Sequence, residues 1–220
     1  MQHVKTDLPI GTVVVTAASL ARYAEFWLAI ESLEVPHGTR LVASRGADIP
    51  HQLNEGIRNM VGEWVWILGD DHSFKPNLLL KLLSRHVDVV MPVVPRREAP
   101  FQSCLMHKSA RYRWADIPTS GLFKLPKGDY AGQAGALVQR RILGMLGDPW
   151  FEAGKLTPGR LMEDMYFIHR LHQLDIPVWI DCDQVMGHMA SLDIVPRLHE
   201  GKWHPSMPSP VGPIILADTE

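Results

Sequence analysis

Cysteine is scarce in this sequence, and no long apolar run interrupts it. The 220 residues include two cysteines, Cys104 and Cys182, so a framework of several disulfides is excluded and a reduced compartment is expected. No apolar stretch approaches the roughly 20 residues that span a bilayer. The N-terminus also lacks the basic segment and apolar run of a signal peptide. These absences predict a cytoplasmic protein without a transmembrane segment.

An excess of positive charge is missing as well. The formal net charge is -2 with histidine neutral, whereas general nucleic-acid binders usually carry a basic excess. The chain also lacks the glycine-rich dinucleotide fingerprint, the Walker phosphate loop and the Gly-x-Ser-x-Gly nucleophile elbow. No nucleic-acid partner is therefore favoured, and the chemistry has to be sought in less familiar clusters.

The first half of the chain alternates short apolar segments with helical patterns. Strands are predicted at 12–17, 39–44, 64–68 and 87–94. Helices are predicted at 19–33, with Ser19 as its N-cap, from about 50 to 62, and at 75–86, with Pro76 in its first turn. This order predicts an α/β fold with a mostly parallel central sheet and helices on both faces, in which ligands collect at the carboxyl ends of the strands.

The second half is less regular. Residues 95–130 read as an irregular segment, and small residues lead into an apolar strand within 131–139. Helices follow at 140–146 and 163–174, and a strand at 176–180. From about residue 195 the chain becomes proline-rich, which predicts an extended or partly disordered tail, or one that wraps the core.

Two acids and a histidine stand at the end of the apolar segment 64–68. Asp70 and Asp71 repel each other, and neither tolerates an apolar setting without a partner. A metal ion, a cationic partner or solvent would offset this cost. Carboxylates bind Mg²⁺, and the adjacent imidazole of His72 favours Mn²⁺ or a similar ion. A solvated acidic turn accounts for the same residues without any ligand.

Other candidates are weaker when each is taken alone. Glu163 and Asp164 open a predicted helix, where acids favour the positive end of the dipole, but one of them could equally serve as a general base. His188 follows a strand and a glycine, and it is one of eleven histidines, most of which are structural or exposed in any protein.

A nucleotide would meet the strand ends at Thr16 and Arg45. It would also meet the helix face shared by Asn54 and Arg58, which are four residues apart. These placements follow from the predicted topology. The alternative for Arg58 is a surface ion pair with Glu55 or another acid.

The order of these motifs resembles the GT-A glycosyltransferases, particularly the family 2-like group. The stretches that carry the resemblance are WILGDDHSF (66–74), AGQAGALVQRRIL (131–143), DPWFE (148–152), MEDMYFIHRL (162–171) and VWIDCDQVMGHM (178–189). Together they cover roughly residues 10 to 190. The resemblance implies a Rossmann-like GT-A domain over 1–194, with a nucleotide-binding half at about 10–94, an acceptor and metal half at about 95–194, and a proline-rich tail at 195–220.

The resemblance also implies a metal-dependent enzyme that moves a sugar from a UDP- or GDP-sugar to an acceptor hydroxyl. The acceptor would be a glycan, a lipid, a protein or a small molecule. Asp71 and His188 would hold Mn²⁺ or Mg²⁺, and Asp164 would be the base, with Glu163 beside it. Asp70 would contact the donor.

Two points of this assignment stay open in the sequence. Gly69 stands where the family has the first acid of its Asp-x-Asp motif. We prefer the register Gly69-Asp70-Asp71, and the other register is Asp70-Asp71-His72, with His72 closing the motif. Further along, the side chains of Arg96 and Arg97 would contact phosphate or acceptor, or form a solvated basic loop.

Two other functions fit the same residues. A metal-dependent phosphohydrolase could be built on Asp70, Asp71, His72 and His188, with a metal-bound water as nucleophile. A non-catalytic nucleotide- or sugar-binding module of the same fold would explain the missing first acid.

Overall fold

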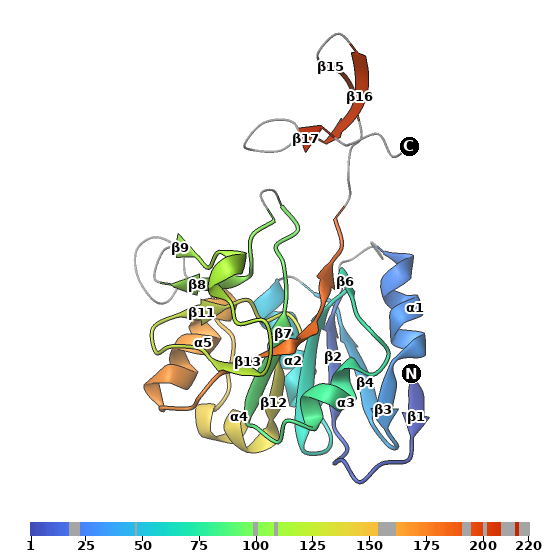
Figure 1. Ribbon diagram of the computed structural model, residues 1–220. Coiled ribbons are helices and arrows are strands. Elements are labelled where there is room, and N and C mark those ends of the chain that lie inside the picture. The colour runs from blue at the N-terminus through green and yellow to red at the C-terminus, as the bar shows by residue number, and fades with distance from the viewer. Residues whose placement is uncertain are drawn as a thin grey trace.

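A seven-stranded sheet occupies the centre of the molecule (Figure 1). The computed structural model describes residues 1–17, 23–46, 48–98, 101–107, 110–153, 162–190, 195–199, 202–207 and 214–215. In order across the sheet, the strands are β10 (Leu122–Lys124), β13 (Trp179–Val185), β7 (Val89–Val93), β12 (Leu137–Gln139), β5 (Trp64–Gly69), β2 (Thr12–Thr16) and β4 (Arg40–Ser44). Strands β4, β2, β5, β7 and β13 run in one direction, because β12 is antiparallel to both of its neighbours. A mixed α/β fold with a mostly parallel sheet is thus confirmed.

The helices pack against the sheet through two clusters of buried side chains. The α-helices are α1 (Ala24–Ser32), α2 (Ile49–Arg58), α3 (Leu78–Leu83), α4 (Arg140–Leu146) and α5 (Glu163–Gln173). A short 3-10 turn lies at Trp114–Asp116. Val14 belongs to one cluster with Leu53 of α2, whereas its neighbour Val13 belongs to the other with Phe26 of α1 and Leu79 of α3. Helices α4 and α5 contribute to the first cluster. Successive strand residues therefore point into different clusters, as the two-residue period of a strand requires.

The structure also contains four smaller sheets within the described residues. Strand β1 (Gln2–Val4) pairs with β3 (Glu34–Pro36), and a three-stranded sheet has the order β11 (Tyr130–Ala131), β8 (Leu105–His107), β9 (Ala110–Arg111). Strand β6 (His72–Ser73) pairs with β14 (Gly187–His188). Strands β15 (Val195–His199), β16 (Lys202–Met207) and β17 (Ile214–Ile215) form an antiparallel sheet of their own.

Local sequence explains how helix α2 is held at its two ends. The side chain of Asp48 accepts a hydrogen bond from the backbone N–H of His51 at 2.8 Å, and Pro50 lies in the first turn. The helix ends at Arg58. Gly62, which the sequence suggested as the helix end, lies beyond it with a positive φ of 76°, a conformation that favours glycine.

Several predicted boundaries were wrong. Helix α1 begins at Ala24 rather than at residue 19, and Ser19 lies outside the described residues. Helix α3 begins after Pro76 and is much shorter than predicted, and strand β13 covers 179–185 rather than 176–180.

Strands are present both in the segment expected to be irregular and in the tail expected to be extended, partly disordered or wrapped around the core. Residues 95–130 include β8, β9, β10 and the start of β11, and the proline-rich tail contains β15, β16 and β17. Short strands with few β-branched residues lack the pattern that identifies a strand from sequence. They form because pairing with neighbouring strands stabilises them.

Cys104 and Cys182 are both free thiols. None of the helices in the described part of the chain has the length and apolar character needed to cross a bilayer.

Candidate functional site

Backbone pairing brings together residues that are far apart in the sequence. In the short ladder between β6 and β14, His188 lies directly opposite His72. The backbone N–H of Met189 donates to the carbonyl oxygen of Asp71 at 2.7 Å. Gly187 permits this approach, since a Cβ on it would lie 2.3 Å from the hydroxyl oxygen of Ser73. The chain after β13 is thereby fixed against the chain after β5.

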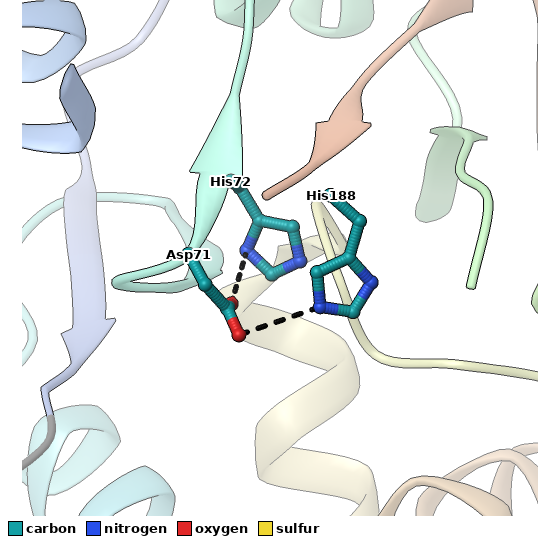
Figure 2. A group of neighbouring side chains, drawn as sticks. All are labelled: Asp71, His72 and His188. Carbon is teal, nitrogen blue, oxygen red and sulfur yellow. Dashed lines mark ion pairs between the residues drawn. The ribbon is translucent and has the colours of Figure 1, made fainter. Parts of the chain in front are cut away.

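Asp71, His72 and His188 form what we call the metal cluster (Figure 2). One ligand atom from each lies within 4.8 Å of the others. Oδ2 of Asp71 is 3.4 Å from Nε2 of His188, and Oδ1 is 3.6 Å from Nδ1 of His72. The two imidazole rings lie side by side, with centroids 4.8 Å apart. One carboxylate and two imidazoles suit Mn²⁺ and similar divalent ions.

The second nitrogen of each imidazole decides whether this cluster fits a metal. Nδ1 of His72 lies 3.0 Å from both the backbone nitrogen and the backbone oxygen of Gly69, and Nδ1 of His188 lies 3.1 Å from the carbonyl oxygen of Pro95. Such backbone contacts orient metal-binding histidines in proteins. Nε2 of His72 is buried and has no hydrogen-bond partner among the described residues. The His72 nitrogen nearest the Asp71 carboxylate is Nδ1. Nε2 is the buried nitrogen that a divalent cation would satisfy, so one carboxylate and two imidazoles are compatible with such an ion.

The charges within the cluster are strongly perturbed. Burial would raise the pKa of Asp71, but the hydrogen bond from His188 and the charges of His72, His188 and Arg97 lower it to about 2. Burial lowers the pKa of His72 to about 4 despite the nearby acids. Asp71 is thus ionised and His72 neutral at pH 7, which are the forms that ligate metals.

His188 behaves differently from His72. Burial would lower its pKa, but hydrogen bonds with Asp71 and Cys104, the charge of Asp71 and the Pro95 carbonyl raise the pKa to about 9. Arg97 also pairs with Asp71, with 2.6 Å between Nη1 and Oδ2. Two cationic groups therefore neutralise the Asp71 carboxylate when no metal is bound, which explains how its charge is tolerated at a buried position. A metal held by His188 would have to displace the proton of this imidazole.

Gly69 provides room for this arrangement. A Cβ at this position would lie 2.8 Å from Oδ1 of Asp71 and 3.0 Å from Cε1 of His72. The acid that the family usually carries there would collide with the cluster. The glycine that departs from the Asp-x-Asp pattern therefore leaves room for His72, which packs against the backbone of Gly69.

A cavity of about 490 Å³ opens beside the metal cluster, which is within the usual size of small-molecule sites. The predicted site residues that line it are Thr16, Asp70, Asp71, Asp164 and His188, together with Arg96 and Arg97. Its described lining does not include Arg45, Asn54, Arg58 or Glu163. The structure thus gathers one part of the predicted set around one cavity and separates the rest from it.

The cavity wall contains polar atoms without partners. Besides Nε2 of His72, the buried amide oxygens of Gln52 and Gln133 lack a hydrogen-bond partner among the described residues. Buried polar atoms are normally satisfied. All three residues line the cavity, so its wall holds hydrogen-bonding groups that the described residues do not satisfy.

Asp164 lies in the first turn of α5, where it reaches the cavity. Its Oδ1 accepts a hydrogen bond from the backbone N–H of Met165 at 2.7 Å. Burial and the adjacent charge of Glu163 raise the pKa of Asp164 to about 6, against the opposing effects of the Met165 N–H and Arg111. A carboxyl group with this pKa suits proton transfer near neutral pH. Glu163 is itself buried and is not among the described lining residues, so its recorded influence on the site is the effect of its charge on the pKa of Asp164.

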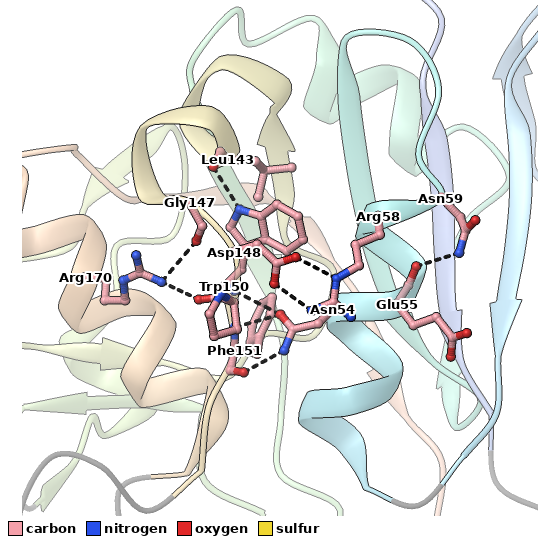
Figure 3. Close-up of polar contacts among 11 residues, drawn as sticks. Asn54, Glu55, Arg58, Asn59, Leu143, Gly147, Asp148, Trp150, Phe151 and Arg170 are labelled. Carbon is pink, nitrogen blue, oxygen red and sulfur yellow. Dashed lines mark hydrogen bonds and ion pairs between the residues drawn. The ribbon is translucent and has the colours of Figure 1, made fainter.

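Asn54 and Arg58 hold a loop instead of lining the cavity (Figure 3). The amide oxygen of Asn54 accepts from the backbone N–H groups of Trp150 and Phe151 at 2.9 and 3.0 Å, and its Nδ2 donates to the Phe151 carbonyl at 2.8 Å. Arg58 forms a two-bond ion pair with Asp148 at 2.6 and 2.7 Å. Both residues therefore have structural contacts, and the surface ion pair considered for Arg58 is present with Asp148 rather than Glu55. Arg45 is exposed.

Sequence reasoning named His72 as a possible metal ligand, but the preferred register of the acidic motif left it out of the metal site. Two other residues of the cavity wall were not singled out. Gln133 lies in a stretch that carries the family resemblance, and Arg111 lies in the segment expected to be irregular. Only the pairing of β8 with β9 and β11 brings Arg111 to the site.

Comparison with known proteins finds a similar fold among solved structures but no sequence match. No protein-family profile and no curated protein sequence matches the chain. Among solved structures, the chain is similar to GalNAc-T7, whose crystal structure contains UDP, GalNAc and Mn²⁺. The TM-score is 0.54 at 10% identity, over 88% of this chain and 44% of GalNAc-T7, so the chain spans less than half of that protein. The fold is glycosyltransferase-like. The protein A197 from STIV has a TM-score of 0.47 at 12% identity, over 94% of this chain and 95% of A197.

Proposed function

We propose that the protein is a metal-dependent glycosyltransferase that uses a nucleotide-sugar donor. The observation that carries this proposal is that the metal cluster and Asp164 line one cavity. The similar fold of GalNAc-T7, crystallised with UDP and Mn²⁺, supports the same reading. The catalytic domain would comprise residues 1–194, with the nucleotide bound mainly by about 10–94 and the acceptor by about 95–194.

Asp71, His72 and His188 would hold the divalent cation, Mn²⁺ or Mg²⁺. When bound, the cation would stabilise the negative charge that develops on the departing nucleoside diphosphate. His72 thereby joins the two ligands expected from the sequence. Arg97, which pairs with the same carboxylate, would contact the diphosphate oxygens.

The donor would occupy the side of the cavity formed by β2 and α2. Thr16 ends β2, and Gln52 offers a buried amide oxygen that has no hydrogen-bond partner among the described residues. Asp70 is buried, lines the cavity and has its backbone N–H bonded to the carbonyl oxygen of Thr16 at 3.1 Å. Hydroxyl or amide donors of a UDP- or GDP-sugar would satisfy these groups.

Asp164 would act as the general base on the acceptor side of the cavity. In the transfer, the acceptor oxygen bonds to the anomeric carbon while the bond from that carbon to the diphosphate oxygen breaks. The electron pair of the broken bond stays on the diphosphate, and the proton of the acceptor hydroxyl passes to Asp164. Glu163 would tune this base through its charge.

A thermal-shift titration tests the proposal. We expect UDP or GDP to raise the melting temperature of the protein markedly more with Mn²⁺ than without it. Asp71→Ala should weaken Mn²⁺ binding by about 100-fold or more, whereas Asp148→Asn, a change of an exposed carboxylate outside the cavity, should leave it intact. The proposal fails if no nucleotide stabilises the wild type with metal, and release of phosphate from simple esters would point to a phosphohydrolase instead.

A further inference from the structure

Three arginines line the cavity, and one of them forms no ion pair with the residues that the structure describes. Arg96 pairs with Glu98 at 2.8 Å and Arg97 with Asp71 at 2.6 Å. Within the described part of the chain, no carboxylate forms an ion pair with Arg111, whose Nη1 donates to the carbonyl oxygen of Cys104 at 3.2 Å. A guanidinium carries five donors, so most of the hydrogen-bonding capacity of Arg111 is left for a ligand.

Arg111 lies beside the candidate base. The carbonyl oxygen of Cys104 accepts hydrogen bonds from both Arg111 Nη1 and the backbone N–H of Gly132, each at 3.2 Å. A Cβ built on Gly132 would lie 3.8 Å from Oδ2 of Asp164. Arg111 and Asp164 therefore approach the same glycine, and the bare glycine leaves the space next to them open to the cavity.

The charges around Arg111 favour an anion. Arg111 is partly buried, and burial together with the like charge of Arg96 lowers its pKa, while the charges of Cys104 and Asp164 oppose the shift. Two guanidinium groups that repel each other across a cavity wall are both stabilised by an oxyanion between them. Arginine is suited to this role, because its planar donors match carboxylate and phosphate groups.

We propose that the acceptor substrate carries a carboxylate or phosphate group, which Arg111 binds while the reacting hydroxyl meets Asp164. This inference rests on the proposed function, since it assigns the acceptor of that same transfer. The unpartnered amide oxygen of Gln133 would accept a hydrogen bond from a further hydroxyl of the acceptor. The donor diphosphate is the other oxyanion that could occupy Arg111, and the experiment separates the two.

The test uses three sugars that differ in one group. Glucose, glucose 6-phosphate and glucuronate are titrated by calorimetry into the full-length protein with UDP and excess Mn²⁺. We expect the two anionic sugars to bind at least about tenfold more tightly than glucose. Arg111→Gln should abolish that tenfold preference while the affinity for UDP with Mn²⁺ stays unchanged. Arg111→Lys, which keeps the charge, should retain part of it.

Arg113→Gln provides the matched control, because Arg113 is two residues away, exposed and paired with Asp116 outside the cavity. It should behave as wild type. Equal binding of glucose and its anionic counterparts would overturn the inference. Weaker UDP binding in Arg111→Gln would overturn it too, by assigning Arg111 to the donor. If the wild-type protein binds neither UDP nor GDP, the proposed glycosyltransferase function is wrong. A preference for anionic sugars that is lost in Arg111→Gln would still support an oxyanion site at Arg111.

Discussion

The metal cluster and the loop held by Asn54 differ in how far their polar atoms are satisfied. Asn54 makes three hydrogen bonds to backbone groups of Trp150 and Phe151. In the metal cluster, Nε2 of His72 has no partner among the described residues, and Asp71 is neutralised by the side chains of Arg97 and His188. A polar network that is complete without a ligand stabilises a fold, whereas an incomplete one is suited to bind something.

The largest effect is expected from Asp164→Asn, which removes the candidate base. The rate of transfer should fall by about 10²- to 10⁴-fold. The pKa of about 6 in the folded protein lies above the ordinary value of 3.8. The folded state therefore binds the proton more tightly, and the wild type loses stability as pH rises from about 4 to about 6. The asparagine variant should lack this loss and be more stable at pH 7, by about 1–3 kcal/mol.

Activity against pH and urea unfolding at several pH values measure both effects. The wild-type rate should rise as pH passes about 6, because the base must be ionised. Glu163→Gln is the comparison variant: removing the adjacent charge should move the midpoint of the rate profile to lower pH. A rate profile that stays flat between pH 5 and 7 would contradict the role of Asp164.

Asn54→Ala should lower the stability of the fold without affecting metal binding, whereas a change in the metal cluster should affect metal binding. It removes the partner of two buried groups of Phe151, the N–H and the carbonyl, and of the partly buried N–H of Trp150, so we expect a loss of about 2–4 kcal/mol in the free energy of unfolding. Mn²⁺ affinity should be unchanged. Asn59→Ala on the same helix is the control, since its one hydrogen bond to Glu55 is exposed. Urea denaturation and Mn²⁺ titration would reveal a wrong assignment if Asn54→Ala weakened metal binding.

These two clusters also show how far the sequence could predict the site. Helical spacing correctly placed Asn54 and Arg58 on one face of a helix, but it says nothing about what that face meets. Their partners, in the loop 148–151, come from a distant part of the chain. Propensity and spacing act over a few residues, and contacts of this kind are decided by tertiary packing.

The metal cluster was only partly predictable, because local sequence patterns do not show which distant residues meet. The alternation of strands and helices placed Asp70 and Asp71 at the ligand edge of the sheet, and the resemblance added His188. The ladder between β6 and β14, which sets His188 opposite His72, involves two residues per strand and leaves no periodic pattern in the sequence. The preferred register therefore passed over His72.

Gly69→Ala tests whether the cluster depends on the missing side chain. The new Cβ would meet Oδ1 of Asp71 at 2.8 Å and Cε1 of His72 at 3.0 Å, so both side chains must shift. We expect Mn²⁺ affinity to fall by about tenfold, about 1.4 kcal/mol. Gly69→Asp, which restores the family motif, should weaken binding at least as much. Tighter Mn²⁺ binding by Gly69→Asp, measured by calorimetry, would show that the glycine is a lost ligand rather than a needed space.

The smallest effect is expected at the edge of the Asn54 network. Arg58 and Asp148 form good two-bond geometry, but their side chains are 47% and 40% exposed. Solvent and salt screen such a pair, so Arg58→Gln should lower the melting temperature by at most about 2 °C, and less at high salt. A double-mutant cycle with Asp148→Asn isolates the pair. A strong coupling that survives high salt would mean that the ion pair, rather than the buried amide of Asn54, holds the loop.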